Sequence, residues 1–364
     1  MKRRKKIKKN VKIIFIGLLM VLLIGIFLLN KPKSIQISSD IERLLSKYNI
    51  GKDKYSKTLE FVLLNGIYEE KYLDMYKDIK FVNRDNFETI LTTFLPKGYN
   101  AEEINLILNL SDKNIEKLKI KDKIDITSFA DYKNFNVDNI TRYQEYKNNN
   151  TSMSMQDVIT QVNLNLDLPV YTNTVEVANG DDLLVLVNKY NHLPQKYAPK
   201  DLVYLDGAYG NQVPVRSIIK DSFLKLQEAA KSEIKIDLKP TTAYRGEDFQ
   251  RTLYNNYVAK DGVTAADTYS ARPGYSEHQT GLSIDLRNTA LSSDIRLTED
   301  NFNWLNNNCY KYGFIIRFPK NKEKITGYQF ENWHIRFVGT EAAKTIHEQN
   351  LTLEEYVDLY IREY

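Results

Sequence analysis

The spacing of apolar positions divides the chain into an apolar run, a helical region and a region that mixes strands with helices. The run from Ile13 to Leu29 holds 17 uncharged residues, close to the roughly 20 that span a bilayer. Residues 31 to about 125 repeat apolar residues at helical spacing, as in IERLLSKY and INLILNL. From 126 to about 155 the residues are mainly Asn, Asp, Ser and Thr, which predicts a loop-rich boundary.

Beyond residue 155, helical and strand patterns follow one another irregularly. Two helix faces are expected, Ile219 with Phe223, Leu226 and Ala230, and Phe249 with Leu253 and Tyr257. IKIDL, which follows the first of these faces, is expected to form a strand. Thr298 is expected to cap a further helix that Gly313 ends, and FIIRF to return as a strand. This irregular order predicts an α+β fold rather than a doubly wound sheet.

One strand pattern carries candidate chemistry. LSIDL alternates apolar and polar residues, which predicts a half-buried strand with Asp285 on the face opposite the core. His278 lies seven residues earlier, beyond a turn that Gly281 permits, so a chain reversal could bring the imidazole beside the Asp285 carboxylate. An aspartate on such a strand is usually solvated. The pair by itself therefore leaves both a surface strand and a metal site open.

A second signal lies about 50 residues further on, in FENWHIRFVG at residues 330–339. Glu331 and His334 are three residues apart, so on a regular strand they would face opposite sides, and we expect Glu331 on a loop or bulge before the strand. Together with His278 and Asp285, His334 would complete a set of two histidines and one carboxylate. Such a set suits tetrahedral zinc with an open fourth position, and Glu331 could take a proton from the attacking water.

Charge and cysteine content exclude some classes of protein. The net charge of +4 is misleading, because residues 1–12 hold eight Lys/Arg and no acid, which leaves 43 Lys/Arg against 47 Asp/Glu elsewhere. Nucleic-acid binding therefore has little support. The only cysteine in the sequence, Cys309, excludes an intrachain disulfide framework and a Cys-rich zinc site, and is expected to be a small buried hydrophobe.

The basic cluster before the apolar run predicts a membrane topology. It indicates a cytoplasmic N-terminus, so everything after Asn30 is expected outside the cell, on a single-pass anchor in the cell membrane. A cleaved signal peptide is the competing interpretation. Its apolar region is usually shorter and is followed by small residues, whereas NKPKS follows here, which favours an uncleaved anchor.

Four segments carry a resemblance to a known family. SEHQTGLSID is similar to the S-x-H-x-x-G-x-x-x-D signature of the zinc D-alanyl-D-alanine carboxypeptidases, and ENWHIRFVG resembles their second signature, E-x-W-H. VNKYNHLPQKYAPKDLV resembles the entry to the VanY-like branch, which is peptidase family M15, subfamily B, and TAYRGEDFQ resembles its S-x-Y-R segment. The resemblance covers roughly residues 155 to 345. It implies a small, mainly antiparallel sheet flanked by helices.

The resemblance also implies roles for individual residues. It assigns His278, Asp285 and His334 as ligands of Zn²⁺, Glu331 as the catalytic base, Arg245 as the catalytic-site arginine that clamps the substrate, and Gln250 and Ser276 as further peptide contacts. Two positions depart from the pattern, because Thr242 stands where the branch often has Ser and Ser283 where it often has Ala. Both are small, so the fit of the substrate pocket is affected rather than the metal site. His192 and His347 match no ligand position.

The sequence thus predicts a membrane-anchored zinc carboxypeptidase that removes the C-terminal D-alanine from peptidoglycan stem peptides. The signatures leave open an L,D-carboxypeptidase acting on tetrapeptide stems, an endopeptidase, or a wall-binding module without catalysis. The expected organisation is a basic cytoplasmic tail at 1–12, a transmembrane anchor at 13–29, a helical region and linker at 30–150, and a catalytic domain at 151–364.

Overall fold

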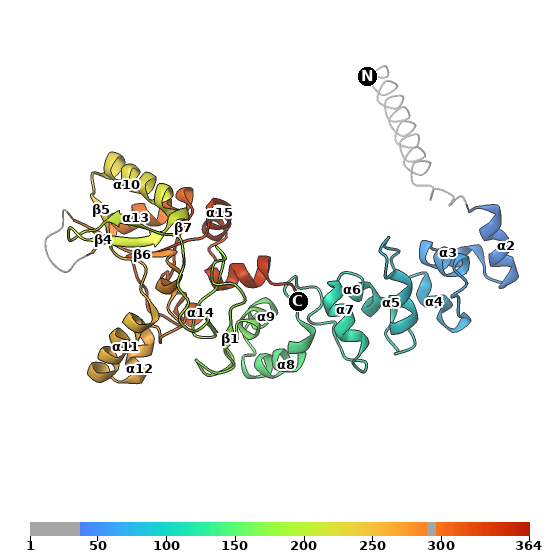
Figure 1. Ribbon diagram of the computed structural model, residues 1–364. Coiled ribbons are helices and arrows are strands. Elements are labelled where there is room, and N and C mark those ends of the chain that lie inside the picture. Colours follow the sequence, from blue (N-terminus) through green and yellow to red (C-terminus); the bar gives the residue numbers. More distant parts are fainter. Residues whose placement is uncertain (1–36, 290–295) are drawn as a thin grey trace, which may run out of the picture. The chain divides into compact units, whose positions relative to one another are not determined.

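The computed structural model describes residues 37–289 and 296–364 (Figure 1). The contacts divide the chain into two compact units, one of residues up to 95 with 100–102, and one of residues 96–99 with 103–364. The described part of the first unit is helical, with α2 Ser39–Lys47, α3 Lys57–Leu64, α4 Leu73–Tyr76 and α5 Phe87–Phe94. The border between these two units lies N-terminal to the domain boundary that the sequence predicts near residue 150. The predicted limits of the functional domains stay a prediction.

Serine caps begin several helices in the N-terminal part of the described chain. The Ser56 hydroxyl accepts a hydrogen bond from the backbone N–H of Leu59 at the start of α3, and Ser111 does the same for Asn114 at the start of α7, Asp112–Lys119. Helix α6, Ala101–Ile107, directly follows the turn residues PKGYN. The helical structure expected for residues 31 to about 125 is therefore confirmed.

The second unit holds further helices and all the described strands. After α7 come α8 Ile140–Asn149, α9 Met155–Asn163, α10 Lys220–Ile234, α11 Glu247–Asp261, α12 Val263–Tyr269, α13 Glu299–Asn308, α14 Glu323–Thr326, α15 Thr340–Glu348 and α16 Leu353–Tyr356. The strands are β1 Val175–Glu176, β2 Asn191–His192, β3 Leu202–Asp206, β4 Gln212–Arg216, β5 Leu238–Thr242, β6 Ser283–Asn288, β7 Phe314–Ile316 and β8 His334–Phe337. The order confirms an α+β fold.

A small antiparallel sheet positions the site. Its four strands lie in the order β5-β6-β8-β7, and each neighbouring pair is antiparallel. In the β6–β8 register, Asp285 pairs with His334. Directly opposed residues on antiparallel strands have their Cβ atoms only about 4.5–5.5 Å apart. The register therefore brings together two residues that are 49 positions apart in the sequence.

The sheet and its helices share one hydrophobic core. Leu282, Ile284 and Leu286 of the β6 segment all lie in it, as their alternation predicts. Helix α10 packs against β5 (Figure 1) and buries the expected face of Phe223, Leu226 and Ala230 in the same core. Cys309 is 2% exposed, as expected of a small buried hydrophobe.

Three local expectations are wrong. The strand expected in IKIDL begins only at Leu238, because α10 continues to Ile234 and Lys235 turns the chain in the left-handed region, with φ of 59°. The residues of 126–155 include α8, because tertiary contacts stabilise a helix that the polar composition of this segment does not favour. In α11 the buried residues are Gln250 and Tyr254, whereas Phe249 is 62% exposed.

Helices that could cross a bilayer are absent from residues 37–289 and 296–364, since none there is both long and apolar enough. The expected anchor, residues 13–29, lies outside the described residues.

Candidate metal and substrate site

The segment before β6 turns sharply and carries the first candidate ligand. Residues Glu277–Thr280 form a single 3₁₀ turn, and Gly281 ends it with a φ of 69°, a backbone conformation that side chains with a Cβ rarely adopt. The backbone N–H of Arg245 donates to the carbonyl of His278 across the site. This turn brings His278 back beside the β6 strand that begins at Ser283.

The structure brings the three candidate ligands together. His278, Asp285 and His334 each offer a ligand atom, and these atoms lie within 4.8 Å of one another. Oδ1 of Asp285 lies 3.4 Å from Nε2 of His278 and 3.3 Å from Nδ1 of His334. All three residues are buried, at 3%, 6% and 3% exposure.

The hydrogen bonds around these residues fit a metal ion. His278 Nδ1 lies 2.7 Å from the carbonyl oxygen of Ala243, which can only accept, so Nδ1 carries the proton and Nε2 presents its lone pair. Oδ1 of Asp285 is buried and accepts no hydrogen bond from the described residues. An orphaned carboxylate oxygen facing two imidazole nitrogens is costly in a protein interior unless a cation takes the place of the missing donors.

The charges in this cluster are strongly coupled. Burial by itself raises the pKa of Asp285, but the two histidines and Arg245 hold it below its usual range, so the carboxylate is charged. Burial lowers the pKa of His334, whereas Glu277, Glu331 and Asp285 raise it to about 9. A metal ion would therefore displace a proton from this ring on binding.

Glu331 lies in the loop just before the short turn that leads into β8, where the sequence predicts a loop. Its Oε2 lies 3.3 Å from Nδ1 of His334, and its backbone N–H donates to the carbonyl of Phe318. The Glu331 side chain is 16% exposed. A carboxylate that borders the ligand set and still reaches solvent has the placement that a proton acceptor for water needs.

Two arginines face the same carboxylate. Nη1 of Arg245 lies 3.8 Å from Oδ2 of Asp285, and Nη1 of Arg296 lies 3.7 Å from it. Among the described residues, Nε of Arg245 and Nη1 of Arg296 are buried without a hydrogen-bond partner. Arg296 also lies over the ring of Trp333, 4.8 Å from its centroid. These guanidinium donors are in place for an anionic group of a ligand.

The ligand residues, Glu331 and both arginines line one cavity of about 330 Å³. Gln250 and Ser276 also line it, and both side chains belong to residues that are at most 2% exposed. Nε2 of Gln250 donates to the carbonyl of Ala271, whereas its Oε1 is buried without a hydrogen-bond partner among the described residues. Four tyrosines are also among the lining residues: Tyr257, Tyr269, Tyr275 and Tyr328.

The other two histidines lie outside the ligand cluster. His192 packs against Tyr275, with ring centroids 5.3 Å apart. His347 stacks on Tyr310 at 4.0 Å. Neither belongs to the metal-binding group found among the described residues.

Sequence reasoning missed several charged residues at this site, among them Glu277, Arg296, Arg317 and Arg336. Arg336 could have been found, because on a strand it faces the same side as His334, two residues earlier. The other three carry no comparable signal. A charged residue in a loop or short turn gives no indication in the sequence that it is buried.

Comparisons with known proteins agree with the geometry. A family model described as VanY, D-alanyl-D-alanine carboxypeptidase, matches residues 212–340. YodJ of Bacillus subtilis is 41% identical over 191 residues, which are 50% of this chain and 69% of that protein. A D-alanyl-D-alanine carboxypeptidase of Enterococcus faecalis is 35% identical over 202 residues, covering 51% of this chain and 71% of that protein.

Solved structures include similar proteins as well. The L,D-carboxypeptidase LdcB is 37% identical, with 51% of this chain and 91% of that chain covered and a TM-score of 0.48. A variant of the D,D-pentapeptidase VanY from the VanB-type resistance cassette, solved in complex with Zn(II), is 34% identical. The match covers 49% of this chain and 99% of that chain, with a TM-score of 0.42.

The match to the VanY family model, together with a buried cluster of two histidines and an aspartate that could hold a metal ion, identifies a zinc-dependent metallopeptidase. The chain belongs to the VanY-like family of D-alanyl-D-alanine carboxypeptidases.

Proposed function

We propose that this protein removes the C-terminal D-alanine from peptidoglycan stem peptides outside the cell, with zinc held by His278, Asp285 and His334. The observation that carries the proposal is that one cavity is lined by a metal-ligand set, a carboxylate beside it and a guanidinium with a free donor. The similarity to a named D-alanyl-D-alanine carboxypeptidase adds support for this substrate class.

Each residue has a separate task in the reaction. A zinc ion, when bound, polarises a carbonyl oxygen and makes water more acidic. Arg245 binds the terminal carboxylate of the peptide and holds the last amide bond against the ligand set. Glu331 takes a proton from the attacking water, whose oxygen bonds to the carbonyl carbon, and returns that proton to the leaving amine nitrogen as the C–N bond breaks. The products are a shortened peptide and free D-alanine.

The arginine favours an exopeptidase over an endopeptidase. A guanidinium can hold a carboxylate through two parallel hydrogen bonds, and only a chain end offers that group. An internal amide bond would leave the buried donors of Arg245 unpaired, which costs binding energy. A wall-binding module without catalysis would have no use for Glu331 beside a complete ligand set.

The test incubates the zinc-loaded protein with pentapeptide and tetrapeptide stems, and with a pentapeptide amidated at its C-terminus. We expect release of one D-alanine from the free pentapeptide and much slower cleavage of the amidated one. Equal cleavage of the two would contradict the carboxylate clamp. Cleavage of the tetrapeptide alone would show an L,D-carboxypeptidase instead.

We propose further that residues 13–29 anchor the protein in the cell membrane with the catalytic part outside. The support is the uncharged run after eight basic residues. Protease added to intact cells with a permeable wall should degrade the part beyond Asn30. Its complete protection, in cells whose surface proteins are degraded, would refute the topology.

A further inference from the structure

Glu277 joins a candidate metal ligand to two buried arginines. Its Oε1 accepts hydrogen bonds from Nε of Arg317 at 2.8 Å and from Nη1 of Arg336 at 2.7 Å, and its Oε2 lies 3.3 Å from Nε2 of His334. The Glu277 side chain is 3% exposed and both arginine side chains are 0% exposed. Although Glu277 precedes His278 in the chain, its carboxylate serves the other histidine.

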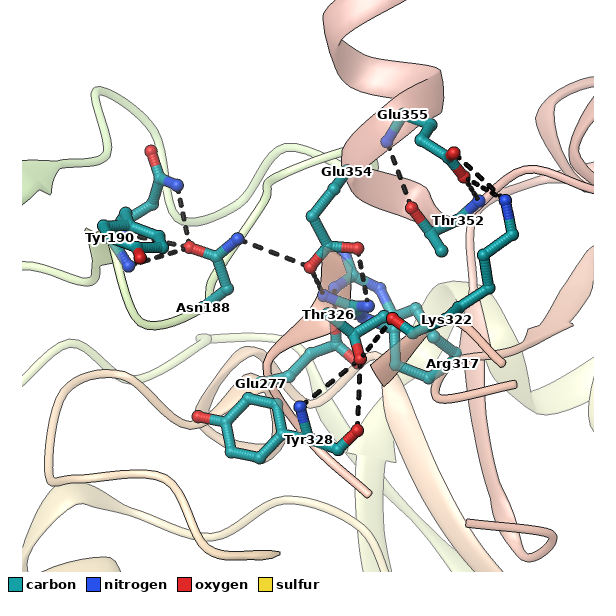
Figure 2. A network of polar contacts seen from close by, with 12 residues as sticks. Asn188, Tyr190, Glu277, Arg317, Lys322, Thr326, Tyr328, Thr352, Glu354 and Glu355 are labelled. Atoms are coloured by element: carbon teal, nitrogen blue, oxygen red, sulfur yellow. Dashed lines mark hydrogen bonds and ion pairs between the residues drawn. The ribbon is translucent and has the colours of Figure 1, made fainter. Parts of the chain in front are cut away.

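The arginines are themselves held on their far sides. Figure 2 shows Arg317 between Glu277 and Glu354, which lies on α16. The two carboxylate oxygens of Glu354 accept hydrogen bonds from Nη1 of Arg317 at 3.0 Å and from its Nη2 at 2.6 Å. Nδ2 of Asn188 donates to the same carboxylate. Segments that are distant in sequence thus meet around one guanidinium, so the Glu277 carboxylate has little freedom to move.

Arg336 is held by backbone groups. Its Nη2 donates to the carbonyls of Leu183 and Val185, each at 3.0 Å, and its Nε donates to the carbonyl of Phe337. The buried group contains two guanidinium ions and two carboxylates, those of Glu277 and Glu354, so its charges balance. Removing one charge leaves the others uncompensated in the interior, which is costly.

We propose that Glu277 is a positioning residue for zinc, which acts by fixing the proton of His334 on Nε2 and leaving the Nδ1 lone pair directed at the metal position. This inference rests on the metal site proposed above. A carboxylate only accepts hydrogen bonds, so Nε2, which is hydrogen-bonded to Glu277, is the donor in that contact. Nδ1 lies 3.3 Å from carboxylate oxygens of Asp285 and Glu331, where a bound metal ion would take the place of its proton. A ligand imidazole commonly donates its second N–H in this way, which sets ring orientation and makes the metal-binding nitrogen more basic.

His278 and His334 differ in the group that fixes the position of the ring hydrogen. His278 donates to a neutral backbone carbonyl, that of Ala243, whereas His334 faces a carboxylate held by two cations. The zinc affinity of the protein should therefore depend on a side chain at His334 but on the backbone at His278. A substitution of Glu277 can test the contact with His334.

Glu277→Gln in the full-length protein is the decisive variant. With its amide oxygen kept toward the arginines, the amide NH₂ would face Nε2 of His334 and favour hydrogen on Nδ1, the nitrogen that the metal needs free. We expect zinc affinity to fall by about 10- to 100-fold, measured by competition with a chromophoric chelator. Unchanged affinity would overturn the proposal.

Glu354→Gln is the matched control, because it makes the same substitution on the other side of Arg317 and touches neither histidine. Both variants should lower the melting temperature, whereas only Glu277→Gln should weaken zinc binding. An equal loss of zinc affinity in both would mean that the network acts on overall structure alone, and would refute positioning. Failure of the unaltered protein to bind zinc would overturn the metal site itself.

A measurement on the unaltered protein covers the case in which Glu277→Gln does not fold. In the ¹⁵N spectrum of the zinc-loaded protein, His334 should show a protonated Nε2 and a metal-bound Nδ1. Metal coordination through Nε2 of His334 would contradict the proposal whatever the variants do.

Discussion

At the scale of single residues, the site is built from polar atoms that other parts of the protein leave unpaired. Oδ1 of Asp285, Nε of Arg245 and Oε1 of Gln250 are all buried and lack a hydrogen-bond partner among the described residues. Each such atom costs free energy in the folded protein, since water satisfied it before folding. Their convergence on one cavity is what a site for a cation and an anionic peptide end requires.

Glu331→Gln should keep the fold and the zinc but lose most turnover. The amide has the shape of the carboxylate and cannot accept a proton, so kcat should fall by roughly 10²-fold or more. The check combines peptidase rates with metal content and a melting curve. Near-normal rates with normal zinc would assign the base to another residue.

At the scale of elements, the turn between the 3₁₀ segment and β6 decides whether the ligands meet. Gly281 has a φ of 69°, and a Cβ there would lie 3.2 Å from Cγ of Arg216 and 3.4 Å from Cδ2 of Leu202. The glycine thus provides both a backbone conformation and the space for strand β4 to approach. The backbone N–H of Arg216 donates to the Gly281 carbonyl at this contact.

Gly281→Ala should destabilise the protein by roughly 1–2 kcal/mol through the left-handed conformation, with an added cost from the close contacts. It should also weaken zinc binding, because His278 and Asp285 lie on either side of the turn. Gly210→Ala is the control, since Gly210 has a φ of 72° but nothing within 4 Å of the added Cβ. Chemical denaturation and zinc titration would measure both variants. Equal effects of the two would show that crowding at Gly281 is unimportant.

At the scale of the whole second unit, a buried acid joins the end of the chain to the turn before α8. Asp358 is 1% exposed, accepts a hydrogen bond from Nδ2 of Asn134 at 2.5 Å, and accepts another from the hydroxyl of Tyr364. Burial raises the pKa of Asp358 from 3.8 to about 6. The folded state therefore binds this proton more tightly than the unfolded state.

The sign of the resulting pH dependence follows from linkage. Between pH 4 and 6 the folded protein holds more protons than the unfolded one at Asp358, so its contribution to stability falls as pH rises and is constant above about pH 6. The total change in the free energy of unfolding that comes from Asp358 is at most about 3 kcal/mol. Asp358→Asn should remove this dependence of the free energy of unfolding on pH. The variant should therefore lose less stability between pH 4 and pH 7 than the unaltered protein does, as measured by denaturation from pH 4 to 8. Asp131→Asn, at an exposed position, is the control, and an unchanged slope in Asp358→Asn would refute the assignment.

The sequence by itself determined several local features of this protein. The alternation of LSIDL placed Leu282 and Ile284 in the core, and the cap at Thr298 started α13, because such signals depend on neighbours a few residues apart. The two signatures also identified the residues that meet at the site. Zinc chemistry could be inferred at this stage because ligand types and their order are written in the chain.

Only the tertiary structure decided which charges are buried and what they touch. The pairing of β6 with β8 sets Asp285 opposite His334, and the packing of α16 places Glu354 on Arg317, which fixes Glu277 against that histidine. The face of α11 that carries Phe249 was likewise mispredicted, since the helical period does not say which side meets the core. Contacts between residues tens of positions apart depend on strand register and helix packing, and local sequence patterns encode neither.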